Sequence, residues 1–200
     1  KKLPNQIKKI VLKDLNKIVT KRKIFNKNSN ATKPLIMGIL NLTPDSFSDG
    51  GLYFQSKKAF IRINHMISKG ADIIDIGGES TRPGSKVIPP KTEWKRLEKV
   101  IINFKKKFPK TFLSIDTRKS EVMLKAIEYK SDLINDVSGF NYDHKAINKI
   151  QDYDIWKVLH HMQGTPNTMQ IKPSYKNVLL DIYDFFEKKI NIDFKNFKYT

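Results

Sequence analysis

From residue 34 onward, short apolar runs alternate with longer amphipathic segments. The short runs are rich in β-branched residues, which predicts five strands, at 35–40, 71–77, 111–116, 132–137 and 154–161. The segments between them carry apolar residues at helical spacing, which predicts four helices, at 57–70, 91–108, 120–130 and around 176–190. Ser120 is the expected N-cap of the helix that it opens. Such alternation is typical of parallel βαβ units with right-handed crossovers.

The first part of the chain has a different pattern. Ile7, Ile10, Val11 and Leu15 fall near helical spacing, and the polar segment NKNSNA follows at 26–31. We therefore expect an N-terminal helix and linker over residues 1–33 and one α/β domain over residues 34–200.

Each predicted strand ends in a cluster of Asn, Asp, Gly, Ser, Thr or His residues. The clusters are NLTPDS, GGESTRPGS, DTRKS, NDVSG and HHMQGTP. Periodicity alone does not separate a doubly wound sheet from a barrel, but active sites of (β/α)8 TIM barrels are built at the C-terminal ends of several strands. The clusters therefore favour a barrel. A barrel takes about 250 residues, so we expect about five of its eight βα units here, with the domain truncated at its C-terminus.

The first cluster contains groups suited to a cation and a flat substrate. The amide oxygen of Asn41 suits a hard cation such as magnesium. Asp45 and Asp49 place two carboxylates on a Gly-ended loop, with Phe47 between them to close over a flat ligand. A loop of Asx turns with incidental acids is the competing interpretation.

The second cluster resembles an anion site. Gly77 and Gly78 permit tight turns, Ser80 and Thr81 carry hydroxyls, and Arg82 carries a planar fork for phosphate or carboxylate. The spacing is neither a P-loop nor a dinucleotide fingerprint. A solvent-facing arginine in a glycine-rich turn is the alternative.

The last three clusters supply hydrogen-bonding groups. An aspartate such as Asp116 accepts from adjacent N–H groups and an asparagine such as Asn135 both donates and accepts, so together they suit the edge of a heterocycle. His160 and His161 follow the fifth strand, and only one of them can enter a site because neighbours on a strand point to opposite faces. Zinc is not expected, since no spaced carboxylate or third histidine lies nearby.

Composition adds mostly exclusions. The formal net charge is +18, but only five of the 38 basic residues are arginine, and the lysines are spread among many Asn and Ile residues. This is the pattern of AT-rich codon usage, and no nucleic-acid-binding motif accompanies it. The absence of cysteine excludes disulfides and thiolate metal sites. No apolar run approaches the length of a membrane span or a signal peptide, so we expect a cytoplasmic protein.

Two long motifs resemble the signature segments of the dihydropteroate synthase family. They are MGILNLTPDSFSDGG at 37–51 and GADIIDIGGESTRPGS at 70–85. SIDTRKSEV, LINDVSGF and HMQGTPNTMQ are similar to the family's next three motifs, in the same order. The resemblance implies a homodimeric, pterin-binding TIM barrel. With magnesium, it would join 6-hydroxymethyl-7,8-dihydropterin pyrophosphate to p-aminobenzoate and release pyrophosphate.

The resemblance also implies roles for residues on the pterin side of the site. Asn41 matches the residue that binds the magnesium–pyrophosphate unit. Asp116 and Asn135 match residues that hydrogen-bond the pterin. Val137 and His160 match the surrounding pocket, although many relatives carry methionine at the position of His160.

A second set matches the aminobenzoate and pyrophosphate side. Thr81 and Arg82 match residues near both groups, and Phe47 and Pro83 match the pocket for the aminobenzoate ring, where sulfonamides compete. Asp49 matches an acid that supports positive charge on the reacting carbon. Asp49 and Arg82 are the expected catalytic residues.

Alternatives follow from what the first 200 residues do not contain. The family's later DPG-type segment, its serine–arginine–lysine segment and its Arg/His anion site have no counterparts before Thr200. A non-catalytic pterin-binding remnant or fragment is therefore one alternative, and the pterin-binding domain of a folate-dependent methyltransferase is another. The N-terminal extension would suit a linker from a fused pterin pyrophosphokinase.

Overall fold

The computed structural model describes residues 4–19, 34–43, 52–80, 85–165 and 168–193. The chain divides into two compact units, one comprising residues 1–34 with 198–200 and the other residues 35–197. The first unit contains the expected N-terminal helix, α1 (Asn5–Val19). Among the described helices, none is long and apolar enough to cross a membrane.

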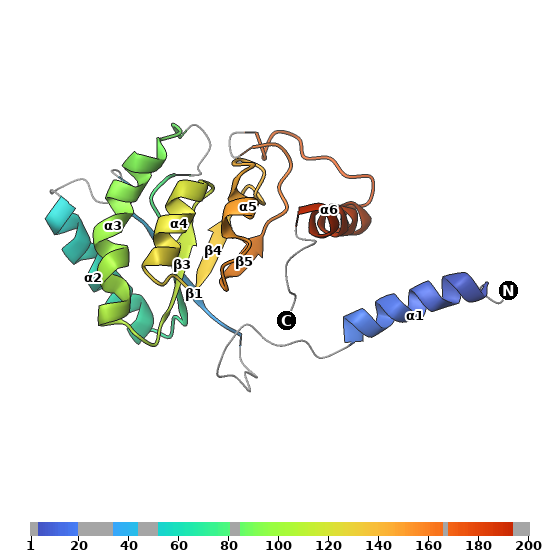
Figure 1. Ribbon diagram of the computed structural model, residues 1–200, viewed down its shortest axis with the longest axis horizontal. Helices are drawn as coiled ribbons and strands as arrows, with labels where there is room; N and C mark the ends of the chain where they lie inside the picture. Colours follow the sequence, from blue (N-terminus) through green and yellow to red (C-terminus); the bar gives the residue numbers. More distant parts are fainter. Residues whose placement is uncertain (1–3, 20–33, 44–51, 81–84, 166–167, 194–200) are drawn as a thin grey trace. The chain divides into compact units, whose positions relative to one another are not determined.

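The second unit alternates strands with helices (Figure 1). Its five strands form a single parallel sheet in the sequential order β1-β2-β3-β4-β5. The elements in chain order are β1 (Met37–Asn41), α2 (Leu52–Ser68), β2 (Ile73–Gly77), α3 (Pro90–Lys107), β3 (Phe112–Asp116), α4 (Ser120–Glu128), β4 (Leu133–Asp136), α5 (Ala146–Ile150), β5 (Trp156–Leu159) and α6 (Val178–Asp193).

The predicted strands and long helices are confirmed, with shorter strands than the sequence suggested. Helix α5 was not predicted, because five residues are too few to display a helical period. The assignment of Ser120 as an N-cap was wrong, since Ser120 is the first residue of α4 and Lys119 precedes it without a side-chain cap. The N–H of Ser120 instead donates to Oδ2 of Asp143 at 2.9 Å. Local sequence rules miss this cap because Asp143 lies 23 residues away.

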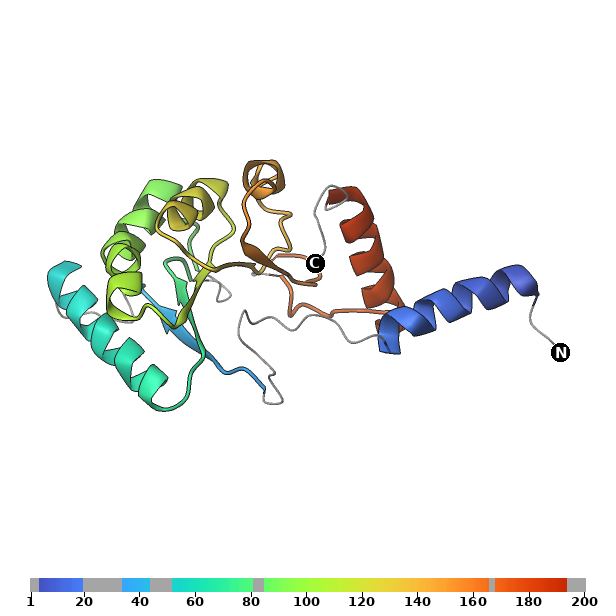
Figure 2. The ribbon, with the colours of Figure 1, turned by 60° about the horizontal axis from the view of Figure 1, so that its bottom comes forward.

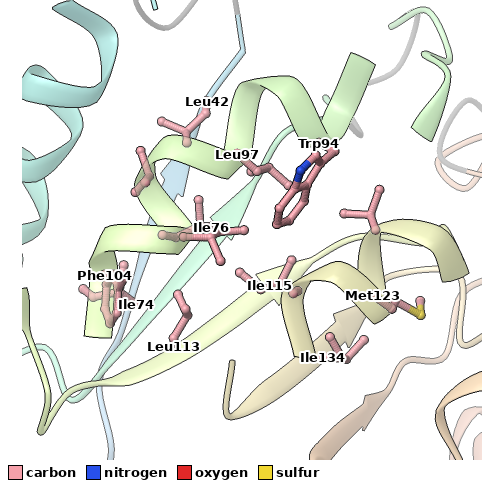
Figure 3. Close-up of a cluster of buried hydrophobic side chains, with 14 of the residues drawn as sticks. Leu42, Ile74, Ile76, Trp94, Leu97, Phe104, Leu113, Ile115, Met123 and Ile134 are labelled. Carbon is pink, nitrogen blue, oxygen red and sulfur yellow. The ribbon is translucent and has the colours of Figure 1, made fainter. Parts of the chain in front are cut away.

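One face of the sheet packs against helices α2 to α5 (Figures 1 and 2). Alternate strand residues meet the helices there, and Figure 3 shows the resulting apolar cluster between β2, β3 and β4 and helices α3 and α4. Burying one such Leu, Ile or Phe side chain stabilises the fold by about 1.5–3 kcal/mol. Fully buried members include Ile74, Ile76, Leu97, Phe104, Leu113, Ile115, Met123 and Ile134.

The opposite face of the sheet carries the residues between the core positions, because side chains alternate along a strand. Ile39 is 65% exposed on this face, whereas Leu40 next to it is 4% exposed in the core. The polar residues Asp75 and Ser114 alternate in the same way with Ile74, Ile76, Leu113 and Ile115. The sheet therefore separates an apolar, helix-covered face from a face available for chemistry.

The long-range cap of α4 gives a stability prediction. Replacing Asp143 with Ala removes the acceptor for the N–H of Ser120 and also the acceptor for the N–H of Lys145. We expect the free energy of unfolding, measured with urea, to fall by about 1 kcal/mol, as for other lost caps. Asp152→Ala, at an exposed aspartate just beyond α5, is the matched control and should change it little. Equal losses in both variants would contradict the capping role.

Candidate active site

Four residues from four neighbouring strands share one level of the sheet. Asn41 pairs with Gly77, Gly77 with Asp116, and Asp116 with Asn135. All four lie at or near the C-terminal ends of β1 to β4, because the strands are parallel. We call these four residues the polar row. The structure thus brings together three side chains that the sequence indicated separately.

Gly77 leaves space between two of these side chains. A Cβ atom at this position would lie 3.3 Å from Oδ1 of Asn41 and 3.3 Å from Oδ2 of Asp116. An amide oxygen and a carboxylate oxygen therefore approach the same gap. Both are hard ligands of the kind that Mg²⁺ accepts, and Mg²⁺ commonly takes only one or two protein oxygens beside substrate phosphates and water.

Within the described residues, no group of three or more His, Cys, Asp or Glu side chains could hold a metal ion. The assignment of Asn41 as a magnesium ligand stays a prediction.

Asp75 lies one level deeper on the same face and is 4% exposed. The hydroxyl of Ser114 donates to its Oδ1 at 2.5 Å, and Nδ2 of Asn135 donates to its Oδ2 at 3.1 Å. The carboxylate on β2 thus reaches across β3 to an amide on β4. Neither Asp75 nor Ser114 was predicted as a site residue from the sequence. The available signal was a lone carboxylate in an isoleucine-rich strand, two residues before Gly77.

The two adjacent histidines separate as expected. Nε2 of His160 lies 2.7 Å from Oδ1 of Asn135, so His160 joins the polar row. Nε2 of His161 lies 3.1 Å from the hydroxyl of Tyr175, and its ring centroid lies 4.7 Å from that of Phe185 on α6. The two side chains thus have different partners, and the assignment of His160 to the pterin site stays a prediction.

A glycine fixes the connection after β4 close to His160. Gly139 has a φ of +58°, and a Cβ there would lie 2.5 Å from the backbone oxygen of His160. Only glycine allows this approach at this φ. Val137, predicted to line the pterin pocket, is half-buried in the turn between β4 and Gly139.

Burial and neighbouring carboxylates set the charge of the site. Burial, reinforced by the negative charge of Asp75, Glu93, Asp136 and Glu79, raises the pKa of Asp116 to about 7. Burial also raises the pKa of Asp75, although the hydrogen bonds from Ser114 and Asn135 oppose this shift. Asp116 therefore changes charge near neutral pH.

A buried ion cluster stands beside the row. Nζ of Lys119 lies 2.9 Å from Oε1 of Glu79 and 2.5 Å from Oε2 of Glu93, and Nε of Arg118 lies 2.8 Å from Oε2 of Glu79. Oε1 of Glu79 also accepts from the N–H of Ile88 at 3.0 Å. Glu79 and Ile88 flank the segment that carries Thr81 to Pro83, so the cluster joins the two ends of that connection.

Five predicted residues belong to the connections after β1 and β2. Phe47, Asp49, Thr81, Arg82 and Pro83 lie outside the described residues. Their roles stay predictions.

Comparison with known proteins identifies the family. The family described as pterin binding enzyme matches residues 37–194, which is most of the chain. The chain belongs to the pterin-binding enzyme family. This agrees with a site formed from polar side chains at the C-terminal ends of parallel strands.

Several proteins that are similar to this chain are dihydropteroate synthases. The enzyme of Haemophilus influenzae is 40% identical over 166 residues, which is 83% of this chain and 60% of that protein. A structure of the Clostridium difficile synthase in the presence of pteroic acid matches with a TM-score of 0.74 and 36% identity, over 82% of this chain and 60% of that one. A structure of the Yersinia pestis synthase with a sulfonamide drug complex matches with a TM-score of 0.72 and 38% identity. The match covers 80% of this chain and 57% of that one.

The chain therefore spans about 60% of the length of these relatives. Its five sequential βα units correspond to part of a TIM barrel, which confirms the predicted fold class.

The raised pKa of Asp116 predicts a pH-dependent stability. Above pH 5 this carboxyl group is already ionised in the unfolded chain, whereas in the folded protein it loses its proton only near pH 7. From pH 5 to pH 8 the free energy of unfolding should therefore fall by roughly 2–3 kcal/mol through this group, at about 1.4 kcal/mol per pH unit.

Urea unfolding at both pH values tests this account with two variants. Asp116→Asn should lose much less stability than the wild type between pH 5 and pH 8. Asp184→Asn, at an exposed aspartate on α6, should behave like the wild type. An unchanged pH dependence in Asp116→Asn would contradict the raised pKa.

Proposed function

We propose that this protein is a dihydropteroate synthase, which joins 6-hydroxymethyl-7,8-dihydropterin pyrophosphate to p-aminobenzoate and releases pyrophosphate. The observation that carries the proposal is the polar row, in which Asn41, Asp116 and Asn135 lie at one level of the sheet, at or near the strand ends. The 40% identity to the Haemophilus influenzae dihydropteroate synthase supports it.

In this proposal the polar row binds the pterin. A pterin edge presents a ring N–H and an exocyclic amine beside a carbonyl oxygen. The carboxylate of Asp116 accepts hydrogen bonds from adjacent N–H groups, and the amide of Asn135 both donates and accepts. The two residues are neighbours in the register of β3 and β4, so both side chains can face one ring edge. The half-buried His160 and Val137 would lie around the ring.

The pyrophosphate would lie at the other end of the row, above Asn41. The oxygens of Asn41 and Asp116 near Gly77 suit a magnesium ion, which would offset negative charge on the departing pyrophosphate. Arg82 follows the glycine pair at the end of β2, so its connection leaves the same edge of the sheet. A guanidinium group at that edge would add a bidentate contact to the phosphate oxygens.

The reaction would proceed by departure of pyrophosphate from the carbon attached to the pterin. The C–O bond breaks with its electron pair, and positive charge develops on this carbon, shared with the pterin ring. The amine of p-aminobenzoate then forms the new C–N bond and loses a proton. We propose that Asp49 stabilises the positive charge, while Phe47 and Pro83 hold the aminobenzoate ring and exclude water.

From the resemblance to the dihydropteroate synthase family, we also expect the active protein to be a homodimer.

Pyrophosphate release tests the proposal most simply. The purified protein, supplied with magnesium and the pterin pyrophosphate, should release pyrophosphate only when p-aminobenzoate is present. Asp116→Ala should lower kcat/KM for the pterin substrate by at least about tenfold, because it removes a charged hydrogen-bond partner. Asp184→Ala, on the exposed surface of α6, should leave it unchanged.

The other outcomes distinguish the alternatives. Release without p-aminobenzoate would contradict the proposed second substrate. Transfer of a methyl group from a folate would identify a methyltransferase domain. Pterin binding without any turnover would identify a non-catalytic pterin-binding protein.

A further inference from the structure

Asn135 is held at both ends of its side-chain amide. Its Nδ2 lies 3.1 Å from Oδ2 of Asp75, and its Oδ1 lies 2.7 Å from Nε2 of His160. Asp75 is 4% exposed, and its other oxygen accepts from the hydroxyl of Ser114. Ser114, Asp75, Asn135 and His160 thus form one chain of hydrogen bonds across β2 to β5.

The chemistry of Asp75 determines the direction of this chain. Both of its oxygens act as acceptors, Oδ1 from the hydroxyl of Ser114 and Oδ2 from the NH2 group of Asn135, and an ionised carboxylate has no hydrogen to donate in return. The amide oxygen of Asn135 must then face His160. Because that oxygen is an acceptor, Nε2 of His160 must carry the hydrogen, and in a neutral ring Nδ1 is left as an acceptor.

We infer that Asp75 is a positioning residue that fixes the orientation of the Asn135 amide and, through it, makes His160 an Nε2–H donor beside the pterin. The role toward the pterin rests on the proposed function, whereas the orientation of the amide and the histidine tautomer do not.

The neighbouring backbone supports a fixed histidine. Gly139, with its φ of +58°, brings the turn after β4 against the backbone oxygen of His160. The side chain of the next residue, His161, contacts Tyr175 and Phe185. The backbone at His160 is therefore restrained by the close approach of Gly139 and by the contacts of the next residue, His161.

The isosteric change Asp75→Asn tests the inference. An asparagine at position 75 can either accept from Asn135 or donate to it, and the hydroxyl of Ser114 can adapt to both arrangements. The amide of Asn135 is then free to reverse. The variant keeps the shape of the site but loses the acceptor-only restraint.

Histidine tautomers can be read directly from ¹⁵N NMR spectra of the imidazole rings, because protonated and unprotonated ring nitrogens resonate far apart. The spectra are recorded at pH 8, so that neutral rings are observed. A His160→Gln variant assigns the signals among the four histidines of the chain. We expect the wild type to favour the Nε2–H tautomer of His160 by at least about tenfold, and Asp75→Asn to bring the two tautomers near equality.

Ser114→Ala is the matched control. It removes the other hydrogen-bond partner of Asp75 but leaves Oδ2 as an acceptor, so it should keep the wild-type tautomer. A general loosening of the site would alter both variants equally and would overturn the inference. An Nδ1–H tautomer in the wild type would overturn it without any variant, which covers the case in which Asp75→Asn does not fold.

Calorimetry with 6-hydroxymethylpterin tests the link to the ligand. Asp75→Asn should weaken binding about tenfold, whereas Ser114→Ala should weaken it less. Unchanged affinity in Asp75→Asn would overturn the positioning role toward the pterin. A wild-type protein that binds no pterin would instead refute the proposed function, and the tautomer result would still stand or fall on its own.

Discussion

The register of the parallel sheet is the constraint on which the site depends. Neighbouring side chains along each strand point to opposite faces, so the apolar positions that pack under α3 and α4 also decide which residues face away from them. Ile76 and Ile115 are fully buried, which places Gly77 and Asp116 on the opposite face at the same level. A slip of one residue would exchange these faces and would bury the carboxylate of Asp116 under the helices. The core thus positions the chemistry without contacting it.

Carboxylates close together in a buried place oppose folding, and their arrangement shows how the fold tolerates them. Asp75 receives hydrogen bonds from Ser114 and Asn135, and Glu79 is paired with Arg118 and Lys119. No hydrogen bond or cation offsets the negative charge of Asp116 among the described residues, and its pKa rises to about 7. In a ligand site, such a destabilised group gains partners when the ligand binds. This arrangement is typical of functional sites rather than of structural ion pairs.

Much of this organisation could be predicted from the sequence, because it depends on local patterns. The alternation of strands and helices followed from periodicity, and Asn41, Asp116 and Asn135 stood out because each ends a strand. Asp75 was missed because its role depends on contacts across two strands, with partners 39 and 60 residues away. The cap of α4 by Asp143 was missed for the same reason. Most predicted strands were longer than the observed ones because residues such as Leu35, Val137 and His161 continue the apolar or β-rich pattern beyond the paired residues.

The most direct test of the central claim, that the polar row binds a pterin, is a crystal structure of the protein with 6-hydroxymethylpterin. We predict that the edge of the pterin ring lies within about 3 Å of the carboxylate of Asp116 and the amide of Asn135. The ligand would then lie on the face of the sheet opposite the helices. A hollow lined by Ile88, Pro90, Tyr142 and Lys145, among others, contains no residue of the polar row. A pterin bound in that hollow, or elsewhere away from Asp116 and Asn135, would contradict the account.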